Sequence, residues 1–238
     1  FGQTAEDFFN SGKAKDSLED FKGAIADYTR VIELDPDGAY AYNSRAYAKN
    51  GIEDYEGAIE DYTKAIELDP DIAKYYLDRG DSKFLLDDIK GSIDDYTKAI
   101  ELDPNVAEYY YTRGFSKFLL DDNKGAIDDY TKAIKLDPDV AIYYNNRGEA
   151  KNGIEDYEGA IADYTKAIEL DPNNNDAYQN RGLAKYLTDD NKGAIADYTK
   201  AIELNPVDTY AYNMRGKSKS YLNDYEGAIA DCTKAIEL

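Results

Sequence analysis

Apolar residues recur along this chain with a bulky ring and a small residue one helical turn apart. Tyr42 and Ala46 form one such pair, and Ala58 and Tyr62 form the next in reverse order. Two helices that pack closely need this arrangement, because the ring fills the space that the small residue leaves. The pairs return every 34 residues, in step with all six prolines: Pro36, Pro70, Pro104, Pro138, Pro172 and Pro206. The pattern therefore predicts a pair of helices copied end to end, without a single central core.

Each copy is expected to contain a helix A and a helix B. With proline at position 32, the copies cover 5–38, 39–72, 73–106, 107–140, 141–174 and 175–208, and an incomplete seventh covers 209–238. We treat the whole chain, 1–238, as a single solenoid domain. Helix A should occupy about the first 13 positions, ended in two copies by Gly51 and Gly153, because glycine accepts the left-handed conformation beyond a helix.

Helix B should begin at an aspartate, whose carboxylate can cap free amides, and stop before each proline. This aspartate is present in all seven copies: Asp20, Asp54, Asp88, Asp122, Asp156, Asp190 and Asp224. Polar residues just after proline are expected to cap the next helix A: Asp37, Asp71, Asn105, Asp139 and Asn173.

The repeated positions resemble the tetratricopeptide repeat (TPR) family, whose signature is an aromatic, Leu-Gly, Tyr, then Ala, an aromatic and Pro. Here the signature reads Y-x2-RG-x2-K, A-x3-Y and P over nearly the whole chain. The resemblance implies an all-α fold, an α-solenoid in which helix-turn-helix units form a right-handed superhelix. The sequence departs from the family at two positions. Arginine replaces leucine at position 7 in all but the first copy, which has Ser11, and lysine replaces tyrosine at position 11 throughout.

The arginines at position 7 have an obvious partner on helix B. Position 23 is always aspartate: Asp27, Asp61, Asp95, Asp129, Asp163, Asp197 and Asp231. We predict an Arg–Asp bridge within each repeat, in preference to ligand binding, because a bidentate guanidinium suits a partly buried contact between helices. The Asp-Asp pairs at 87–88, 121–122 and 189–190 are interpreted as helix starts and not as a metal site, since no D-x-D-x-D-G loop is present.

Composition narrows the function. Lys and Arg number 28 against 49 Asp and Glu, a net charge of −21, and no basic stripe is available for nucleic acid. The chain has no histidine, so a proton shuttle and a histidine-activated nucleophile are excluded, and we expect neither an enzyme nor a bound cofactor or metal. No apolar run is long enough to span a membrane. One cysteine, Cys232, cannot form an internal disulfide, which favours a reducing, cytoplasmic compartment.

The remaining class of function is binding to another protein or peptide, and the residues of helix A that vary between copies are the candidate contact residues. In the TPR family, positions 2, 5, 6, 9, 12 and 13 line a concave groove, so the resemblance implies binding of a peptide or partner helix there. Phe84, Phe118 and Leu119 could instead pack helix A against its neighbours. The predicted groove residues are Tyr40, Asn43, Tyr47, Leu77, Phe84, Tyr111, Phe115, Phe118, Asn145, Asn146, Gln179, Asn180, Leu183 and Tyr186.

The charge of this face indicates the kind of partner. TPR domains that bind the acidic tails of chaperones use a carboxylate clamp with cations at these positions, but positions 5 and 6 contain none here. Acids at positions 2, 5, 6 and 9 (Glu6, Asp78, Asp81, Glu108, Glu149, Asp176) outnumber bases (Lys13, Lys74, Lys217). We therefore expect a neutral or basic protein or peptide.

A different function, self-assembly, stays open as an alternative. The last helix B has no following helix to cover Ile229, Cys232 and Ile236, so either the chain belongs to a longer protein or this end contacts another copy, forming a homo-oligomer. The block NGIEDYEGAI occurs at both 50–59 and 152–161. Such near-verbatim blocks fit recent duplication of segments or an engineered array.

Overall fold

The computed structural model describes residues 3–238, and this part of the chain contains fourteen α-helices and no strand. Odd-numbered helices are the predicted helices A, and even-numbered helices are the helices B. The fold is an all-α solenoid, as predicted. The helices are α1 (Ala5–Asp16), α2 (Phe21–Leu34), α3 (Ala39–Asn50), α4 (Tyr55–Leu68), α5 (Ala73–Leu85), α6 (Ile89–Leu102), α7 (Ala107–Leu119), α8 (Asn123–Leu136), α9 (Ala141–Gly153), α10 (Tyr157–Leu170), α11 (Asn175–Leu187), α12 (Asn191–Leu204), α13 (Thr209–Tyr221) and α14 (Tyr225–Glu237).

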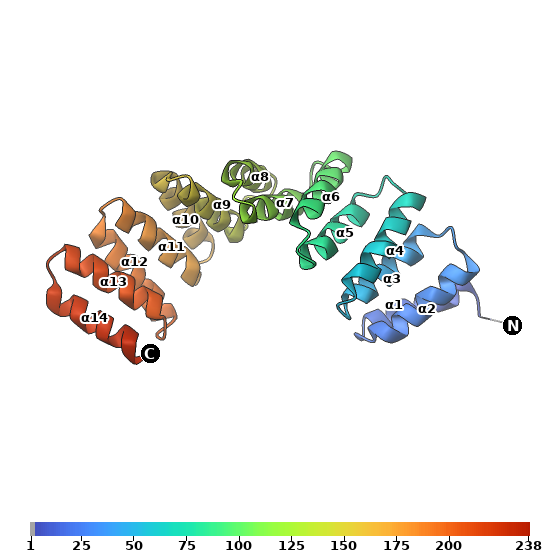
Figure 1. The fold of residues 1–238 in the computed structure, drawn as a ribbon, viewed down its shortest axis with the longest axis horizontal. Helices are drawn as coiled ribbons and strands as arrows, with labels where there is room; N and C mark the ends of the chain where they lie inside the picture. The colour runs from blue at the N-terminus through green and yellow to red at the C-terminus, as the bar shows by residue number, and fades with distance from the viewer. Residues whose placement is uncertain (1–2) are drawn as a thin grey trace. The chain divides into compact units, whose positions relative to one another are not determined.

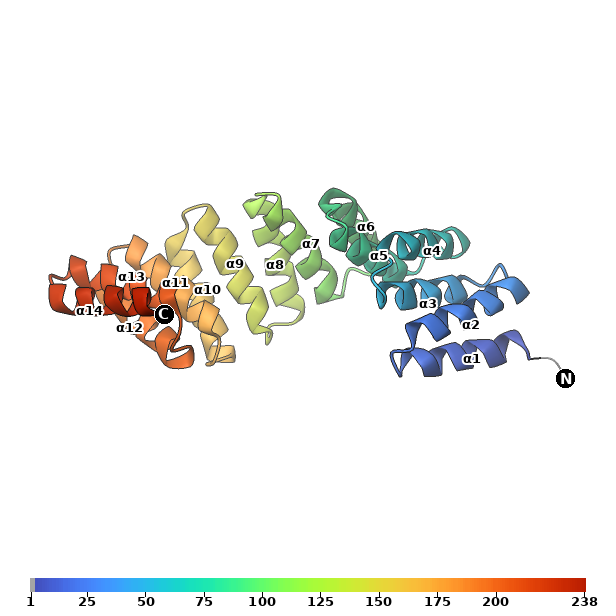
Figure 2. The same cartoon turned by 60° about the horizontal axis from the view of Figure 1, so that its bottom comes forward.

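The chain forms two compact units, unit 1 (Phe1–Leu120) and unit 2 (Asp121–Leu238). Unit 1 contains α1 to α7, and unit 2 contains α8 to α14, so the fourth repeat contributes its helix A to one unit and its helix B to the other. Within each unit, consecutive helices lie side by side, which Figure 1 shows for α1 to α7 and Figure 2 for α8 to α14. A single domain over 1–238 stays a prediction.

Rings and small residues pack as their spacing predicted. A Cβ atom added to Gly80 would lie 2.7 Å from the ring of Tyr96, and one added to Gly148 would lie 2.6 Å from Tyr164. No larger residue fits there without displacing the ring. The core is accordingly a series of clusters within and between successive helix pairs. Its largest buried side chains are the position-24 tyrosines: Tyr28, Tyr62, Tyr96, Tyr130, Tyr164 and Tyr198.

Both departures from the family signature contribute to one ion-pair network. The guanidinium of Arg45 donates from Nε and Nη2 to the two carboxylate oxygens of Asp61, at 2.8 and 2.7 Å, and Nζ of Lys49 lies 2.8 Å from the same carboxylate. Arg45 also donates from Nη1 to the hydroxyl of Thr29 in the preceding repeat, at 3.2 Å. The predicted Arg–Asp bridge is therefore confirmed in this repeat, and the arginine also links neighbouring repeats. The first repeat differs, since it has Ser11 at this position and Asp27 pairs with Lys15 at 2.6 Å. The same bidentate bridge joins Arg79 to Asp95, Arg147 to Asp163, Arg181 to Asp197 and Arg215 to Asp231.

The helix ends follow the predictions only for helix B. Each of the seven aspartates at position 16 caps helix B, as Asp54 does by accepting from the backbone N–H of Gly57 at 3.1 Å. The glycines predicted to end helix A are not left-handed. Gly51 has a φ of −62°, and the left-handed residue is Glu53, with a φ of 62°. The backbone N–H of Asp54 then bonds to the carbonyl of Lys49 at 3.0 Å, which is the Schellman pattern displaced two residues beyond the glycine.

The predicted caps of helix A were also wrong by one residue. The N-cap is the second residue after proline, and in four repeats its side chain forms no capping bond: Gly38, Ile72, Val106 and Val140. Asn174 and Asp208 do cap, accepting from the N–H of Ala177 and Ala211. The residue directly after proline lies within the turn, where it cannot reach the free amides of the next helix.

Candidate functional site

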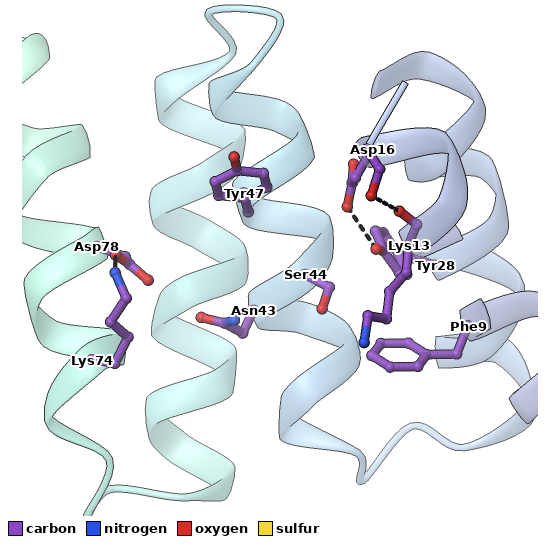
Figure 3. Close-up of a pocket in the computed structure, with 10 residues that line it drawn as sticks. Phe9, Lys13, Asp16, Tyr28, Asn43, Ser44, Tyr47, Lys74 and Asp78 are labelled. Carbon is purple, nitrogen blue, oxygen red and sulfur yellow. Dashed lines mark hydrogen bonds and ion pairs between the residues drawn. The ribbon is translucent and has the colours of Figure 1, made fainter. Parts of the chain in front are cut away.

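The groove face of unit 1 contains two adjoining hollows, of about 540 and 400 Å³. Both are lined by Tyr47, Lys74 and Asp78, and we call them together the unit 1 groove. The larger hollow, drawn in Figure 3, lies against α1, α3 and α5. Its other lining residues are Phe9, Lys13, Asp16, Ser17, Tyr28, Asn43 and Ser44. The smaller hollow adds Phe21, Asn50, Gly51, Tyr62 and Asp81.

Aromatic rings form the apolar part of the groove. The ring of Phe9 meets that of Tyr40 edge to face, with centroids 5.0 Å apart, and contacts Tyr28 at 5.6 Å. Tyr47 is 58% exposed. Such rings can provide a large contact area at a low cost in side-chain entropy.

The polar part of the groove contains carboxylates that are poorly neutralised. Nζ of Lys74 lies 2.5 Å from Oδ1 of Asp78, and the hydroxyl of Tyr96 donates to Oδ1 of Asp81 at 2.8 Å. Burial raises the pKa of Asp81 to about 6, and the negative charges of Asp78 and Glu108 add to the effect. Burial also raises the pKa of Asp78, despite its contact with Lys74. At neutral pH this region therefore contains more negative than positive charge.

The predicted groove residues of unit 1 lie at different depths. Tyr40 and Tyr47 are exposed, and Asn43 is half-buried in the larger hollow. Leu77 is only 1% exposed, within a core cluster that includes Tyr76 and Tyr109, so it cannot contact a ligand.

Further along unit 1, rings from successive helices A meet. The rings of Phe84 and Phe115 have centroids 5.8 Å apart, which supports the packing alternative for Phe84. Tyr111 and Phe118 are half-buried, and Leu119 is exposed.

In unit 2, the predicted amides bond to other side chains of the same unit. Asn145 and Asn146 are buried, and Nδ2 of Asn145 lies 3.4 Å from Oε1 of Glu149. Asn180 donates to the same Glu149 oxygen at 2.8 Å. Burial raises the pKa of Glu149. These contacts leave fewer free amides for a partner backbone than the sequence indicated.

The last predicted residues of unit 2 are largely engaged as well. Gln179 donates to Oδ2 of Asp208 at 2.7 Å. Leu183 and Tyr186 pack against the core cluster that contains Met214. They are half-buried, so only part of each side chain is accessible to a partner.

The predicted groove residues include none from the first repeat, although Lys13 was counted among the charges of this face. Phe9 and Asp16, which also line the larger hollow, occupy positions 5 and 12, so the 34-residue register could have identified them. Tyr28 lies on a helix B, and its hydroxyl reaches the groove by donating to Asp16 at 2.6 Å. No sequence signal distinguishes it from the other position-24 tyrosines.

The described part of the chain has neither a cluster of metal ligands nor a helix that could span a membrane. Between residues 3 and 238, no group of three or more acidic or cysteine side chains is arranged to hold a metal ion. Over the same residues, every helix is too short or too polar to cross a membrane.

Family models match almost the whole chain. Tetratricopeptide repeat models match residues 8–37, 39–72, 73–106, 176–208 and 209–238, and TPR repeat models match 116–151 and 154–189. No curated protein matches the sequence significantly.

Three solved structures illustrate the similarity in fold. The MamA protein is 28% identical, with a TM-score of 0.68 over 71% of this chain and 92% of that one. YrrB, described as a TPR protein with an unusual peptide-binding site, is 23% identical, with a TM-score of 0.70 over 77% and 95%. A tetratricopeptide repeat protein from Parabacteroides merdae is 18% identical, with a TM-score of 0.74 over 99% and 93%.

Proposed function

This chain belongs to the tetratricopeptide repeat family, and from that membership we propose that its helices A hold an extended peptide or a partner helix, chiefly in the unit 1 groove. TPR arrays are protein-interaction scaffolds, so the chain is a scaffold and not an enzyme. The observation that carries the proposal is the pair of adjoining hollows, both lined by the exposed ring of Tyr47 and containing more carboxylates than cations.

The shape and chemistry of the unit 1 groove suit a peptide better than a small molecule. Its two hollows adjoin along the face of α3, so a ligand that fills both must be elongated. The exposed ring of Tyr47 lines both of them, which is the usual place for a residue that dominates binding energy. A chaperone-tail clamp is disfavoured, because Lys74 is already paired with Asp78.

Peptide selection tests this proposal even though the natural partner is unidentified. Random peptides displayed on phage would be selected for binding to the immobilised chain, and the dissociation constants of the selected peptides would be measured by fluorescence polarisation. Tyr47→Ala should raise these dissociation constants by about tenfold or more, equivalent to a loss of at least about 1.4 kcal/mol of binding free energy. Tyr157→Ala is the matched control, because Tyr157 is also partly exposed but lies at the start of α10, a helix B outside the unit 1 groove. Equal effects of the two substitutions, or none from Tyr47→Ala, would show that binding occurs elsewhere.

Self-association through α14 is the second candidate function. Ile229 and Ile236 are largely exposed, and Cys232 lines two hollows beside them, of about 490 and 370 Å³. An apolar patch of this kind can bind a second copy. Light scattering over a concentration series should then give a mass that rises with concentration, and Ile229→Glu should abolish the rise. A constant monomer mass up to the highest concentration would remove this candidate.

A further inference from the structure

The outer face of α14 presents a stripe of apolar side chains to solvent. Tyr225, Ile229 and Ile236 are 59%, 68% and 87% exposed, and Cys232, between the two isoleucines, is half-buried. Along α14, which Figure 1 shows beside α13, these four residues are separated by steps of four, three and four positions. This is the spacing of the seam along which two helices interlock, so the stripe has the pattern of a helix contact.

The other helices B cover the same stripe with the helix A that follows. On α10, for example, Ile161 and Ile168 occupy the positions of Ile229 and Ile236, and they pack into core clusters that contain residues of α11. The isoleucines at these two positions are half-buried or buried in all six earlier repeats. Among residues 3–238, α14 is therefore the one helix B on which this stripe is exposed.

Two hollows flank Cys232 on the outer face of α14. The hollow of about 370 Å³ is lined by Cys232, Ile229 and, on α13, Ser220. The hollow of about 490 Å³ is lined by Cys232, Ile236 and, on α13, Tyr210. The other six repeats have tyrosine at the position of Cys232, and a thiol occupies less space than a ring. The stripe thus has an isoleucine and a hollow on each side of its centre.

The repeat that contains α14 is also the only one without a net charge. Residues 209–238 contain four Asp and Glu against four Lys and Arg, whereas residues 5–38 contain nine against four, a net charge of −5. Every repeat except 209–238 is acidic, in a chain whose total charge is −21. Two copies of so acidic a chain repel each other, and the repulsion is weakest between neutral surfaces. The α14 face is therefore the place where one copy can approach another most closely.

The outer face of α1 does not complement this stripe. Position 3 of a helix A packs on the preceding helix B, as Ala177 of α11 does in a core cluster with Ala167 of α10. At this position α1 has the exposed Asp7, which forms a capping box with Thr4. At position 7, α1 has Ser11 in place of the arginine that donates to the preceding helix B in later repeats. Burial of a carboxylate against isoleucines is costly, so head-to-tail stacking of copies is disfavoured.

We propose that two copies of the chain pair symmetrically, with α14 of one copy antiparallel to α14 of the other. This inference rests on self-association, the second function proposed above, and specifies its geometry. A two-fold axis near Cys232 places Ile229 of each copy opposite Ile236 of the other, so that each isoleucine enters a hollow beside Cys232. Antiparallel helices also place opposite ends of their dipoles together, which a parallel pair does not. Because both copies use the same face, the assembly closes at two copies.

Light scattering and cross-linking of the 238-residue chain test the symmetry of the pair. The mass should rise with concentration and level off at twice the monomer mass, because pairing through one face closes. Mild oxidation with copper phenanthroline should then join two chains by a disulfide. Since Cys232 is the only cysteine, this bond can form only where the two α14 helices meet.

Paired substitutions test the antiparallel arrangement. Ile229→Glu and Ile236→Lys should each abolish the dimer, because either one places a charge in the apolar contact. Both isoleucines are exposed in the single chain, so the circular dichroism spectrum should not change. A mixture of the two variants should restore the dimer, since the new glutamate of one copy then faces the new lysine of the other. Leu18→Glu is the matched control, because Leu18 is 80% exposed but lies just after α1, and this variant should dimerise normally.

The outcomes separate this inference from self-association itself. A constant monomer mass would overturn both and leave a helix of a different protein as the occupant of the stripe. A mass that rises beyond the dimer, with Cys232 cross-linking to a chain that carries Cys232→Ser and Ser11→Cys, would show head-to-tail stacking; self-association would stand and the symmetric pair would be wrong. Dimers of the unmodified chain that do not cross-link, or that mixing the two variants does not restore, would likewise overturn the antiparallel pairing of α14.

Discussion

Two aspartates of the third repeat show how differently one residue type can behave in neighbouring regions. Asp95, at the contact between helix A and helix B, is 4% exposed and accepts from Arg79 at 2.9 and 2.6 Å, with Nζ of Lys83 at 2.8 Å. Asp81, on the groove face, accepts only from the Tyr96 hydroxyl and has acidic neighbours. Burial of a charge therefore does not reveal its role until its partners are counted.

The contrast extends to the other unit and to the pKa values. Asp163 of the fifth repeat is held by Arg147 and Lys151, whereas Glu149 of the same repeat has only amide donors. In the last repeat, burial would raise the pKa of Asp231, but the hydrogen bonds of its arginine and lysine partners outweigh burial and lower it. The charged form of Asp231 is thus favoured in the folded protein, whereas burial disfavours the charged forms of Asp81 and Glu149.

The largest effect is expected at the helix contact. Asp95→Asn leaves the guanidinium of Arg79 and the ammonium of Lys83 partly buried without a counter-charge. Removing one partner from such a network should lower the free energy of unfolding by about 3 kcal/mol. Urea denaturation followed by circular dichroism measures the change at pH 7.5. Because repeat arrays can unfold in steps, the transition midpoint and its slope should both be compared with the unmodified chain.

Asp94→Asn provides the control, since Asp94 precedes Asp95 on α6 and its side chain is exposed. It should leave the midpoint nearly unchanged. If Asp95→Asn and Asp94→Asn shift the midpoint equally, the ion-pair network contributes little to stability. Asp95 would then not differ from Asp81 in the way proposed.

The regular part of this structure could be predicted because it depends on constraints repeated in every copy. The match of Tyr96 to Gly80 and of Arg79 to Asp95 follows from one helix pair, and the tyrosine and the arginine each recur at the same position in six copies, which makes the spacing unmistakable. The ends of helix A could not be predicted in the same way. Glu53 is left-handed, and not Gly51, because the position of the turn depends on where helix B must begin, which glycine alone does not indicate.

The sequence predicted which face of helix A is exposed, but not how deeply each side chain on that face is buried. The helical register correctly places Tyr40 and Tyr47 on an exposed face, but it cannot show that Leu77 is covered by rings from neighbouring helices. Nor could it show that Asn180 already donates to Glu149, since that contact joins successive repeats. Depth depends on the sizes of side chains in adjacent copies, and these positions are the ones that vary.

The smaller and opposite effect is expected in the groove, where Asp81→Asn should stabilise the protein. The pKa of Asp81 is raised from 3.8 to about 6, so the folded state binds a proton that the unfolded chain has already released. Protonated Asp81 therefore makes its whole contribution to the free energy of unfolding below about pH 4, and this contribution is lost as the pH rises through about 6. Asparagine carries no charge and can still accept from Tyr96, so at pH 7.5 the variant should gain of the order of 2 kcal/mol.

The pH dependence of that gain is what distinguishes electrostatics from packing. Urea midpoints of the variant and the unmodified chain should nearly coincide around pH 4, separate as the pH rises to about 6, and stay apart up to pH 7.5, whereas a packing effect would be the same at pH 4 and pH 7.5. A loss of stability at pH 7.5 would mean that the folded protein stabilises the charged form of Asp81, and the contrast between the groove and the contacts between helices would then disappear. A gain means that the fold keeps a carboxylate it would be more stable without, which is the signature expected of a residue retained for binding.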